Sequence, residues 1–430
     1  MAKKIGIIGG GQLGLMIAEA AHRQGALVYA LDPAPDAPAF AECDGHIVAE
    51  YDDLNALEQL GDMTDVLTYE FENVPGDILR HLEGKYEIPQ GIAPLFDSQD
   101  RLREKNNAKR NGLPVPDYIP LPACTADEDC TEVPEACGEE GNCQCGQIPV
   151  TDGQRREELR DAVKILGMPC VLKTRRMGYD GHGQAVIREE KDIDKAAELL
   201  HVPCILESFV KFDYECSVIM VRNREKTIHF PVGRNIHRGG ILDLSIVPAA
   251  GLYGPDGKPS ELCTRMVNAC GHFMESCGYM GILAVELFVK GDTFVFNEMA
   301  PRPHNSGHYT IEGCTSSQYD ELCRFLLGKA LTQPELKAPA LMKNILGQDL
   351  EAVWKIIDTA HAGHRENPAE VPVSDTAKRD NAYCGEAGNG VFVHIYGKTE
   401  SRPKRKMAHV TYVPMTPERF SQEWADKFVK

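Results

Sequence analysis

Two carboxylates inside adjacent apolar runs could share a divalent cation. Glu286 lies in the run 281–289 and Glu298 ends the run 293–298, with residues 290–292 between them. A β-hairpin with residues 290–292 as its loop would place both carboxylates on one face as diagonal neighbours, about 7–8 Å apart at Cα. Mg²⁺ in ATP-using sites is usually bound by one or two carboxylates plus substrate phosphates. We therefore expect Mg²⁺ here. The alternative is that one glutamate points to solvent, which a one-residue change of register would achieve.

A donor-rich loop follows Glu298 directly and contains Arg302, His304, Asn305 and Ser306. Guanidinium, imidazole, amide and hydroxyl groups gathered at the end of a strand suit a small oxyanion. The position beside Glu298 favours a shared site over an ordinary polar loop.

Two further segments gather cations. Lys173, Arg175 and Arg176 end a predicted strand, and glycines then recur through residues 178–184. Such a loop could close over a polyphosphate, exclude water and neutralise charge, whereas the alternative is an exposed basic hairpin. Near the C-terminus, another predicted strand is followed by four cations, Lys398, Arg402, Arg405 and Lys406. On charge alone, a solvated basic turn would be the better interpretation of these four.

The N-terminal glycines have the spacing of a phosphate-binding turn. Gly9, Gly11 and Gly14 follow the predicted strand 4–8, and Asp32 comes eighteen residues after the last glycine. Backbone amides at the start of a helix can bind an anion or a nucleotide, and a dinucleotide is one candidate. A tight turn without a ligand is the alternative.

Alternating strands and helices must position this turn. Strands are predicted at 4–8, 27–31 and 66–69, and the helix after the first of them ends at Gly25. Acidic residues follow the later strands, and ligands of open α/β sheets bind at that carboxyl edge. We expect a doubly wound first domain of about a hundred residues.

Composition bounds the class of protein. The chain has 430 residues, is 43% hydrophobic and 26% charged, and carries a net charge of −18, which indicates several globular domains and argues against a protein that coats nucleic acid. It lacks both a run of roughly 20 apolar residues and a signal-peptide pattern, so we expect no membrane segment. Its 15 cysteines are an odd number and too few for a disulfide scaffold of this length, which favours a reducing cytoplasm.

An inserted surface loop is expected at residues 122–150. This segment holds five cysteines and seven acidic residues without lysine or arginine. It lacks periodicity and any C-x-x-C spacing, so both a metal- or partner-binding appendage and an acidic loop with free thiols stay open. A second irregular stretch is expected at about 362–390.

Together these residues resemble the N5-carboxyaminoimidazole ribonucleotide synthase family of ATP-grasp enzymes in purine biosynthesis. The resemblance covers nearly the whole chain apart from the two irregular stretches. It departs from the family pattern at Met177, His182 and Arg234. The motifs that carry it are Gly9–Gly14, Tyr69–Val74, Ser98–Arg101, Tyr179–Gly181, Asn297–Glu298, Arg302–His308 and Tyr396–His409.

The resemblance implies a mixed α/β and α+β protein of three domains. These are an N-terminal doubly wound parallel-sheet domain at 1–100, an ATP-grasp domain at 101–345 and a small C-terminal β-rich domain at 346–430. It also implies a homodimer and the carboxylation of 5-aminoimidazole ribonucleotide. In that reaction ATP converts bicarbonate to carboxyphosphate, which carboxylates the exocyclic amine and leaves ADP and phosphate.

The resemblance implies a role for each matching residue. Catalytic roles fall to Tyr179, Asp180, Arg302, His304, Asn305 and Lys398, and Mg²⁺ binding to Glu286 and Glu298. Ribonucleotide binding falls to Gly11, Gln12, Leu13, Glu70, Asn73, Arg402 and Arg405. ATP binding falls to Arg101, Lys173, Gly178, Tyr179, Asp180, Gly181, His182, Gly183, Gln184, Glu207, Ser208, Phe209, Val210, Glu215, His237, Asn297 and Glu298.

Two other functions stay open. The nearer is another carboxylate–amine ligase on the same fold. The second is a nicotinamide-dependent dehydrogenase, suggested by the glycine turn and Asp32, which leaves the loop at 178–184 and the glutamate pair without a role.

Overall fold

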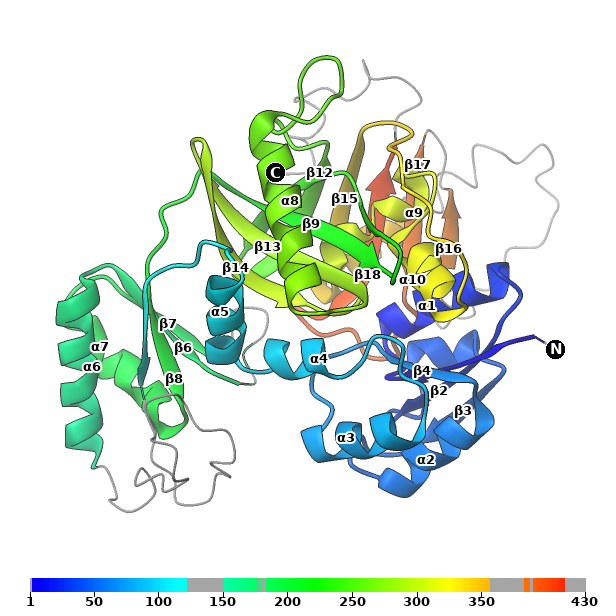
Figure 1. Ribbon diagram of the computed structural model, residues 1–430, viewed down its shortest axis with the longest axis horizontal. Helices are drawn as coiled ribbons and strands as arrows, with labels where there is room; N and C mark the ends of the chain where they lie inside the picture. The colour runs from blue at the N-terminus through cyan, green and yellow to red at the C-terminus, as the bar shows by residue number, and fades with distance from the viewer. Residues whose placement is uncertain are drawn as a thin grey trace.

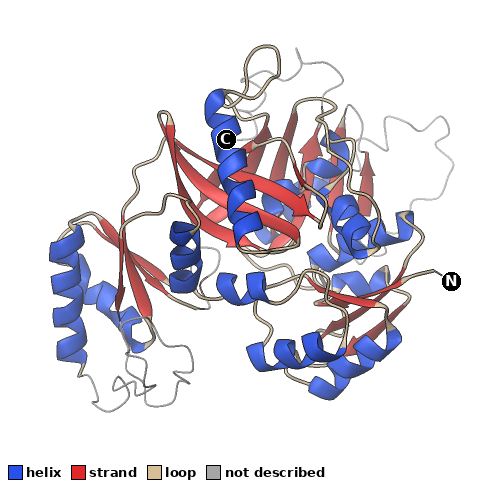
Figure 2. Ribbon diagram, viewed as in Figure 1, coloured by secondary structure: helices blue, strands red, loops and turns tan. Residues whose placement is uncertain are grey.

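The computed structural model contains three β-sheets (Figure 1, Figure 2). It describes residues 2–121, 151–176, 178, 183–355, 383–386 and 390–413. The predicted insertion at 122–150 and the predicted loop residues 179–182 therefore lie outside the described residues.

The N-terminal sheet is parallel and covered on both faces, as predicted. Its strand order is β3-β2-β1-β4. Helix α1 packs on one face, and α2 and α3 on the other. The strands are β1 (Lys4–Ile8), β2 (Leu27–Asp32), β3 (Gly45–Val48) and β4 (Val66–Tyr69), and the helices α1 (Gln12–Arg23), α2 (Leu54–Met63) and α3 (Gly76–Lys85).

Two helices lead from this sheet to a small antiparallel one. They are α4 (Ala93–Ser98) and α5 (Arg101–Arg110). The small sheet has the order β5-β8-β6-β7 and stands apart from the other two in Figure 1. It consists of β5 (Tyr118–Leu121), β6 (Cys170–Thr174), β7 (Gln184–Ile187) and β8 (Cys204–Ser208), packed against α6 (Asp152–Leu166) and α7 (Asp192–Ala196).

A ten-stranded sheet forms the centre of the molecule, in the order β14-β13-β9-β11-β12-β15-β18-β17-β16, with β10 paired to β9. Helix α8 (Glu261–Ser276) packs on it. The strands are β9 (Tyr214–Arg222), β10 (Thr227–His229), β11 (Gly233–Arg238), β12 (Ile241–Val247), β13 (Gly281–Lys290), β14 (Thr293–Ala300), β15 (Ala340–Leu346), β16 (Tyr383–Glu386), β17 (Val391–Ile395) and β18 (Lys406–Tyr412).

The C-terminal strands extend this same sheet, because β18 pairs with β15. The domain limits named above stay predictions. The prediction of an irregular stretch through 362–390 is wrong at one point, since β16 pairs with β17 over Tyr383–Glu386. A four-residue edge strand containing a glycine is too short to show periodicity.

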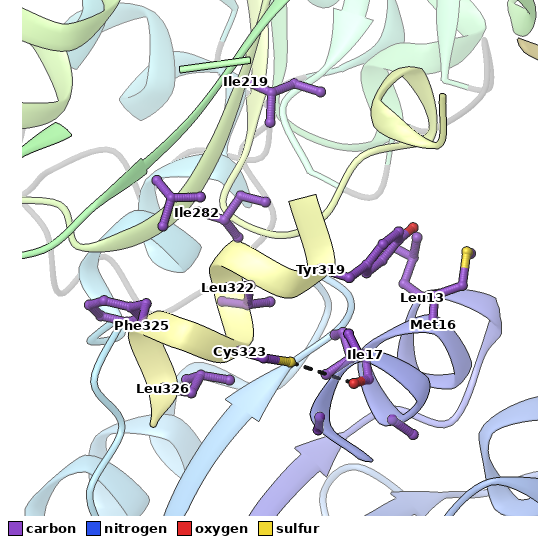
Figure 3. Packing of buried hydrophobic residues seen from close by; sticks show 14 of the residues in the cluster. Leu13, Met16, Ile17, Ile219, Ile282, Tyr319, Leu322, Cys323, Phe325 and Leu326 are labelled. Atoms are coloured by element: carbon purple, nitrogen blue, oxygen red, sulfur yellow. Dashed lines mark hydrogen bonds between the residues drawn. The ribbon is translucent and has the colours of Figure 1, made fainter. Parts of the chain in front are cut away.

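Helix α10 (Gln318–Leu326) joins the N-terminal sheet to the central one. Figure 3 shows Leu322 and Phe325 on α10 near Ile219 and Ile282 of the central sheet. On its other side, Cys323 donates through Sγ to the carbonyl of Ile17 in α1. One hydrophobic core therefore continues across both parts.

Neither cysteine pairing nor a bilayer span is found among the described residues. Among the cysteines whose side chains the structure describes, nine are free, and seven of these are buried. No helix of the described chain combines the length and apolar character that crossing a bilayer requires.

Candidate active site

Glu286 on β13 and Glu298 on β14 lie directly opposite each other. The predicted three-residue loop and diagonal arrangement are wrong, because Lys290 pairs with Thr293 and leaves a two-residue turn. That register alone would set Glu286 opposite Asn297. A β-bulge adds one residue to β14 at this point, so Glu298 takes the place across from Glu286.

The two carboxylates have different electrostatic surroundings. Burial and then the charge of Glu298 raise the pKa of Glu286 to about 7. Burial also works against ionisation of Glu298, but Arg101 and Lys173 outweigh it and hold the pKa of Glu298 below its usual value. Arg101 Nη1 donates to Glu298 Oε2 at 3.0 Å. Ionisation of Glu286 beside ionised Glu298 is therefore unfavourable, and a cation shared by the two carboxylates would relieve this repulsion.

The donor-rich loop lies beside this pair, as predicted. His304 Nε2 is 3.4 Å from Glu286 Oε1, and its Nδ1 is 2.8 Å from Ser306 Oγ. Burial and the nearby charge of Arg302 hold the pKa of His304 well below its usual value, so the imidazole is neutral. Asn305 is buried and its side-chain oxygen has no hydrogen-bond partner. The loop thus presents polar groups in a dry setting.

Arg302 connects this loop to the N-terminal sheet. Its Nη2 lies 2.6 Å from Oε1 of Glu72, in the segment that follows β4. Glu72 was not predicted as a site residue, although it stands within the quoted motif 69–74.

A group of three possible metal ligands adjoins Glu286. Glu215 on β9, His237 on β11 and Glu286 offer ligand atoms that all lie within 4.8 Å of one another. Burial disfavours the imidazolium of His237, but the Glu215 and Glu286 carboxylates outweigh it and raise the pKa of His237. Three predicted site residues are therefore brought together.

Lys173 on β6 reaches the end of β8. Its Nζ donates to Glu207 Oε2 at 2.9 Å, and Lys105 Nζ lies 3.5 Å from Glu207 Oε1. Burial works against ionisation of Glu207, but the two lysines lower its pKa to about 2. Lys105 was missed by the sequence analysis, although it lies one helical turn after Arg101, a spacing that places both on one face of α5.

The predicted nucleotide-binding segments are only partly described. Tyr179, Asp180, Gly181 and His182 lie outside the described residues. Gly178, Gly183 and Gln184 flank that gap. Ser208, Phe209 and Val210 follow Glu207 where β8 ends, and Phe209 is 40% exposed.

Arg175 and Arg176, which we expected to bind a polyphosphate, both pair with Asp100. Arg175 donates to both carboxylate oxygens of Asp100, at 3.0 and 2.6 Å, and Arg176 donates to the same carboxylate at 3.3 Å. Asp100 also accepts from the amide of Leu102 at the start of α5. These arginines therefore fix the entry to α5.

The glycine turn is filled by carboxylates. Glu70 accepts from the amides of Gly11 and Gly14 at 2.5 and 2.6 Å, and Asp32 accepts from the amide of Gly10 at 2.8 Å. A Cβ on Gly11 would lie 2.5 Å from Glu70 Oε1, so glycine is required for this approach. The predicted phosphate-binding amides are thus paired internally, and Asp32 is not available to a ribose.

The remaining predicted ribonucleotide residues are spread around this turn. Leu13 is buried in the core that Figure 3 shows, and Asn73 is exposed. Lys398 Nζ donates to Gln12 Oε1 at 2.7 Å, so the predicted catalytic lysine reaches the glycine turn. Arg402 and Arg405 are exposed and both donate to Glu400.

Three family descriptions match successive parts of the chain. Residues 1–94 match the ribonucleotide synthetase preATP-grasp domain, residues 147–319 the ATP-grasp domain, and residues 340–423 the phosphoribosylaminoimidazole carboxylase C-terminal domain.

Similar proteins agree with these matches. The N5-carboxyaminoimidazole ribonucleotide synthase of Bacillus subtilis is 36% identical over 99% of this chain and 95% of its own length. A Staphylococcus aureus N5-carboxyaminoimidazole synthetase crystallised with ADP has a TM-score of 0.78 at 32% identity, covering 100% of this chain and 98% of that one. An Aspergillus clavatus synthase crystallised with ADP and 5-aminoimidazole ribonucleotide shares the fold, with a TM-score of 0.77 at 24% identity, covering 100% of this chain and 99% of that one. The chain therefore belongs to the N5-carboxyaminoimidazole ribonucleotide synthase family, whose members are ATP-dependent ligases of purine biosynthesis with the ATP-grasp fold.

Proposed function

We propose that the residues around Glu286 and Glu298 carry out the family's reaction, the ATP-dependent carboxylation of 5-aminoimidazole ribonucleotide to N5-carboxyaminoimidazole ribonucleotide. The observation that carries this proposal is the opposed glutamate pair, with the loop of Arg302, His304 and Asn305 beside it. Family membership excludes the dehydrogenase and any other carboxylate–amine ligase as the assignment.

Glu286 and Glu298 fit Mg²⁺ by the chemistry of their donors. Mg²⁺ prefers oxygen ligands and usually keeps substrate phosphates and waters as well. The group of Glu215, His237 and Glu286 includes a nitrogen donor, which suits transition metals better. We therefore assign Mg²⁺ to the glutamate pair. When bound, Mg²⁺ would neutralise charge on the phosphates of ATP.

The ATP site lies between the small sheet and the central one. Lys173 and Arg101 supply cations for the phosphates, in exchange for their present partners Glu207 and Glu298. Exposed Phe209, at the end of β8, offers an aromatic face for the base. The other predicted ATP ligands are Gly178, Tyr179, Asp180, Gly181, His182, Gly183, Gln184, Ser208, Val210, Glu215, His237 and Asn297.

In this proposal, bicarbonate binds beside the donor-rich loop. Its oxygen attacks the γ-phosphorus of ATP, ADP leaves, and carboxyphosphate forms. Arg302 can hold the planar oxyanion through two N–H groups, and neutral His304 can donate a hydrogen bond without adding charge. Because carboxyphosphate hydrolyses readily, the burial of Asn305 helps by keeping water out.

The ribonucleotide belongs between this loop and the glycine turn. Arg302 of this loop pairs with Glu72 after β4, and Lys398 after β17 donates to Gln12 at the glycine turn. The exocyclic amine would attack the carbonyl carbon of carboxyphosphate, and phosphate would leave. The other predicted ribonucleotide ligands are Gly11, Leu13, Glu70, Asn73, Arg402 and Arg405.

Phosphate release tests this proposal. We expect release that requires ATP, Mg²⁺, bicarbonate and 5-aminoimidazole ribonucleotide together, and that falls at least about a hundredfold in Glu298→Gln. Lys258→Gln, an exposed lysine in a loop away from this pair, is the control and should match the wild type. Release that does not depend on the ribonucleotide would contradict the proposal.

The predicted homodimer and cytoplasmic location stay predictions. Sedimentation of the purified enzyme at several concentrations would measure the first.

A further inference from the structure

Helix α5 contacts three consecutive residues at the bulge of β14. Arg101 donates to the carboxylate of Glu298 at 3.0 Å. Lys105 Nζ donates to the carbonyl of Asn297 at 2.5 Å, and the amide of Met299 donates to Glu104 Oε1 at 2.5 Å. Two of these three contacts are made to the main chain, on either side of the metal-site carboxylate.

Glu104 and Lys105 are charged groups in a dry interior. Glu104 is 2% exposed and Lys105 is 1% exposed. Lys105 also lies over the ring of Phe296, 5.2 Å from its centroid, and near Glu207. Burying charge costs free energy, and replacing buried ion pairs by apolar side chains is often neutral or stabilising. Fold stability alone therefore does not explain why charged residues occupy these two buried positions.

The bulge supplies a reason. An extra residue in a strand disrupts the ladder and loses its regular partner. Here the extra residue is what sets Glu298 opposite Glu286. Donor and acceptor groups from α5 satisfy the main chain at 297 and 299, so they hold the bulge in place.

We propose that Glu104 and Lys105 are positioning residues that hold the main chain of residues 297–299 so that the Glu298 carboxylate faces Glu286. This inference rests on the proposal that Glu286 and Glu298 bind Mg²⁺. Neither residue needs to touch substrate, because each acts through the backbone beside Glu298. Mutation of groups that orient metal ligands typically weakens metal binding about 10–100-fold.

The test compares Lys105→Met and Glu104→Leu, each of which removes one hydrogen bond to the main chain of β14 with little change in side-chain volume. Glu104→Gln is the conservative variant, because its amide oxygen can still accept from Met299. Lys109→Met makes the same change at an exposed position in the last turn of the same helix and is the matched control. Two quantities are measured for the full-length enzyme: the affinity for Mn²⁺ in the presence of ADP, by electron paramagnetic resonance, and the free energy of unfolding in urea.

We expect Lys105→Met and Glu104→Leu to weaken Mn²⁺ binding about tenfold. Lys105→Met also leaves buried Glu207 with one lysine fewer and should cost stability. Recovery of Mn²⁺ affinity in Glu104→Gln therefore separates positioning from a structural role. Glu104→Gln and Lys109→Met should bind Mn²⁺ as the wild type does. If Glu104→Leu does not fold, Lys105→Met decides the question.

Unchanged Mn²⁺ affinity in folded Lys105→Met would overturn the inference. Glu298→Gln, measured alongside, separates this failure from that of the proposed function. If Glu298→Gln also binds Mn²⁺ normally, the metal assignment itself is wrong. If only Glu298→Gln is impaired, the metal assignment stands and the positioning role of α5 is rejected.

Discussion

Arg302 couples two parts of the site. It belongs to the loop beside the glutamate pair, yet its guanidinium pairs with Glu72 in the segment that follows β4. Its Nε is buried without a hydrogen-bond partner. An unsatisfied buried donor is costly, so a bound anion that accepts from it would gain affinity.

Replacement of Arg302 tests the bicarbonate pocket separately from the ATP site. We expect Arg302→Met to lower kcat/KM for bicarbonate at least about a hundredfold, since two charge-assisted hydrogen bonds are lost. ADP affinity, measured by calorimetry, should change little, because Arg302 pairs with Glu72 and not with the phosphate-side residues. Arg302→Lys should remain impaired, as an ammonium cannot form the same two-pronged contact. A variant with normal bicarbonate kinetics would contradict the assignment.

At the scale of elements, short irregular features decide the geometry of the site. The strands at 4–8 and 66–69 were predicted with their observed limits, because apolar runs next to glycine or polar residues are strong local patterns. The bulge at Asn297 was not predicted, since nothing local to β14 marks an extra residue. What stabilises it is α5, almost two hundred residues away in sequence. Long-range contacts of this kind also explain why Lys105 and the pairing of Glu70 with the glycine turn were missed.

A stack of three buried histidines joins the loop after β14 to the C-terminal strands. The ring of His409 on β18 lies 4.5 Å from that of His308 and 4.3 Å from that of His394. Burial, with added repulsion from His394, holds the pKa of both His308 and His409 well below the usual value. The folded protein therefore keeps these two rings neutral.

This stack predicts a loss of stability in acid. An unfolded histidine gains a proton below about pH 6.5, whereas folded His308 and His409 do not. The unfolded state then binds more protons than the folded state does. The contribution of these rings to the free energy of unfolding is therefore fully present above about pH 6.5. As the pH drops further, the free energy of unfolding decreases by up to about 1.4 kcal/mol per pH unit for each ring. His409→Phe should reduce the fall between about pH 6.5 and pH 5 by up to about 2 kcal/mol. Urea unfolding at several pH values measures this, and parallel curves for the two proteins would refute it.

At the scale of the whole molecule, α10 makes the N-terminal and central sheets one body. Its buried face contacts α1 on one side and β9 and β13 on the other (Figure 3). The ribonucleotide and bicarbonate subsites proposed above come from these two parts, so their separation depends on this packing. The architecture followed from the family motifs, but this continuous core did not, because an apolar helix face does not reveal its partner.

Leu322→Ala tests the contribution of this core. Leu322 is fully buried, and the loss of a buried leucine costs about 2–5 kcal/mol. We expect a loss of that size in urea unfolding, while Ile165→Ala at a 76% exposed position should change stability by less than about 0.5 kcal/mol. Equal effects of the two substitutions would show that α10 does not carry the connection.

We expect ATP to activate bicarbonate at the glutamate pair before the amine is carboxylated. Turnover with oxygen-18-labelled bicarbonate measures this directly, because an oxygen of bicarbonate becomes the bridge in carboxyphosphate and leaves with the phosphate. Each phosphate released should therefore carry one oxygen-18 atom from bicarbonate. Unlabelled phosphate, released while N5-carboxyaminoimidazole ribonucleotide still forms, would contradict it.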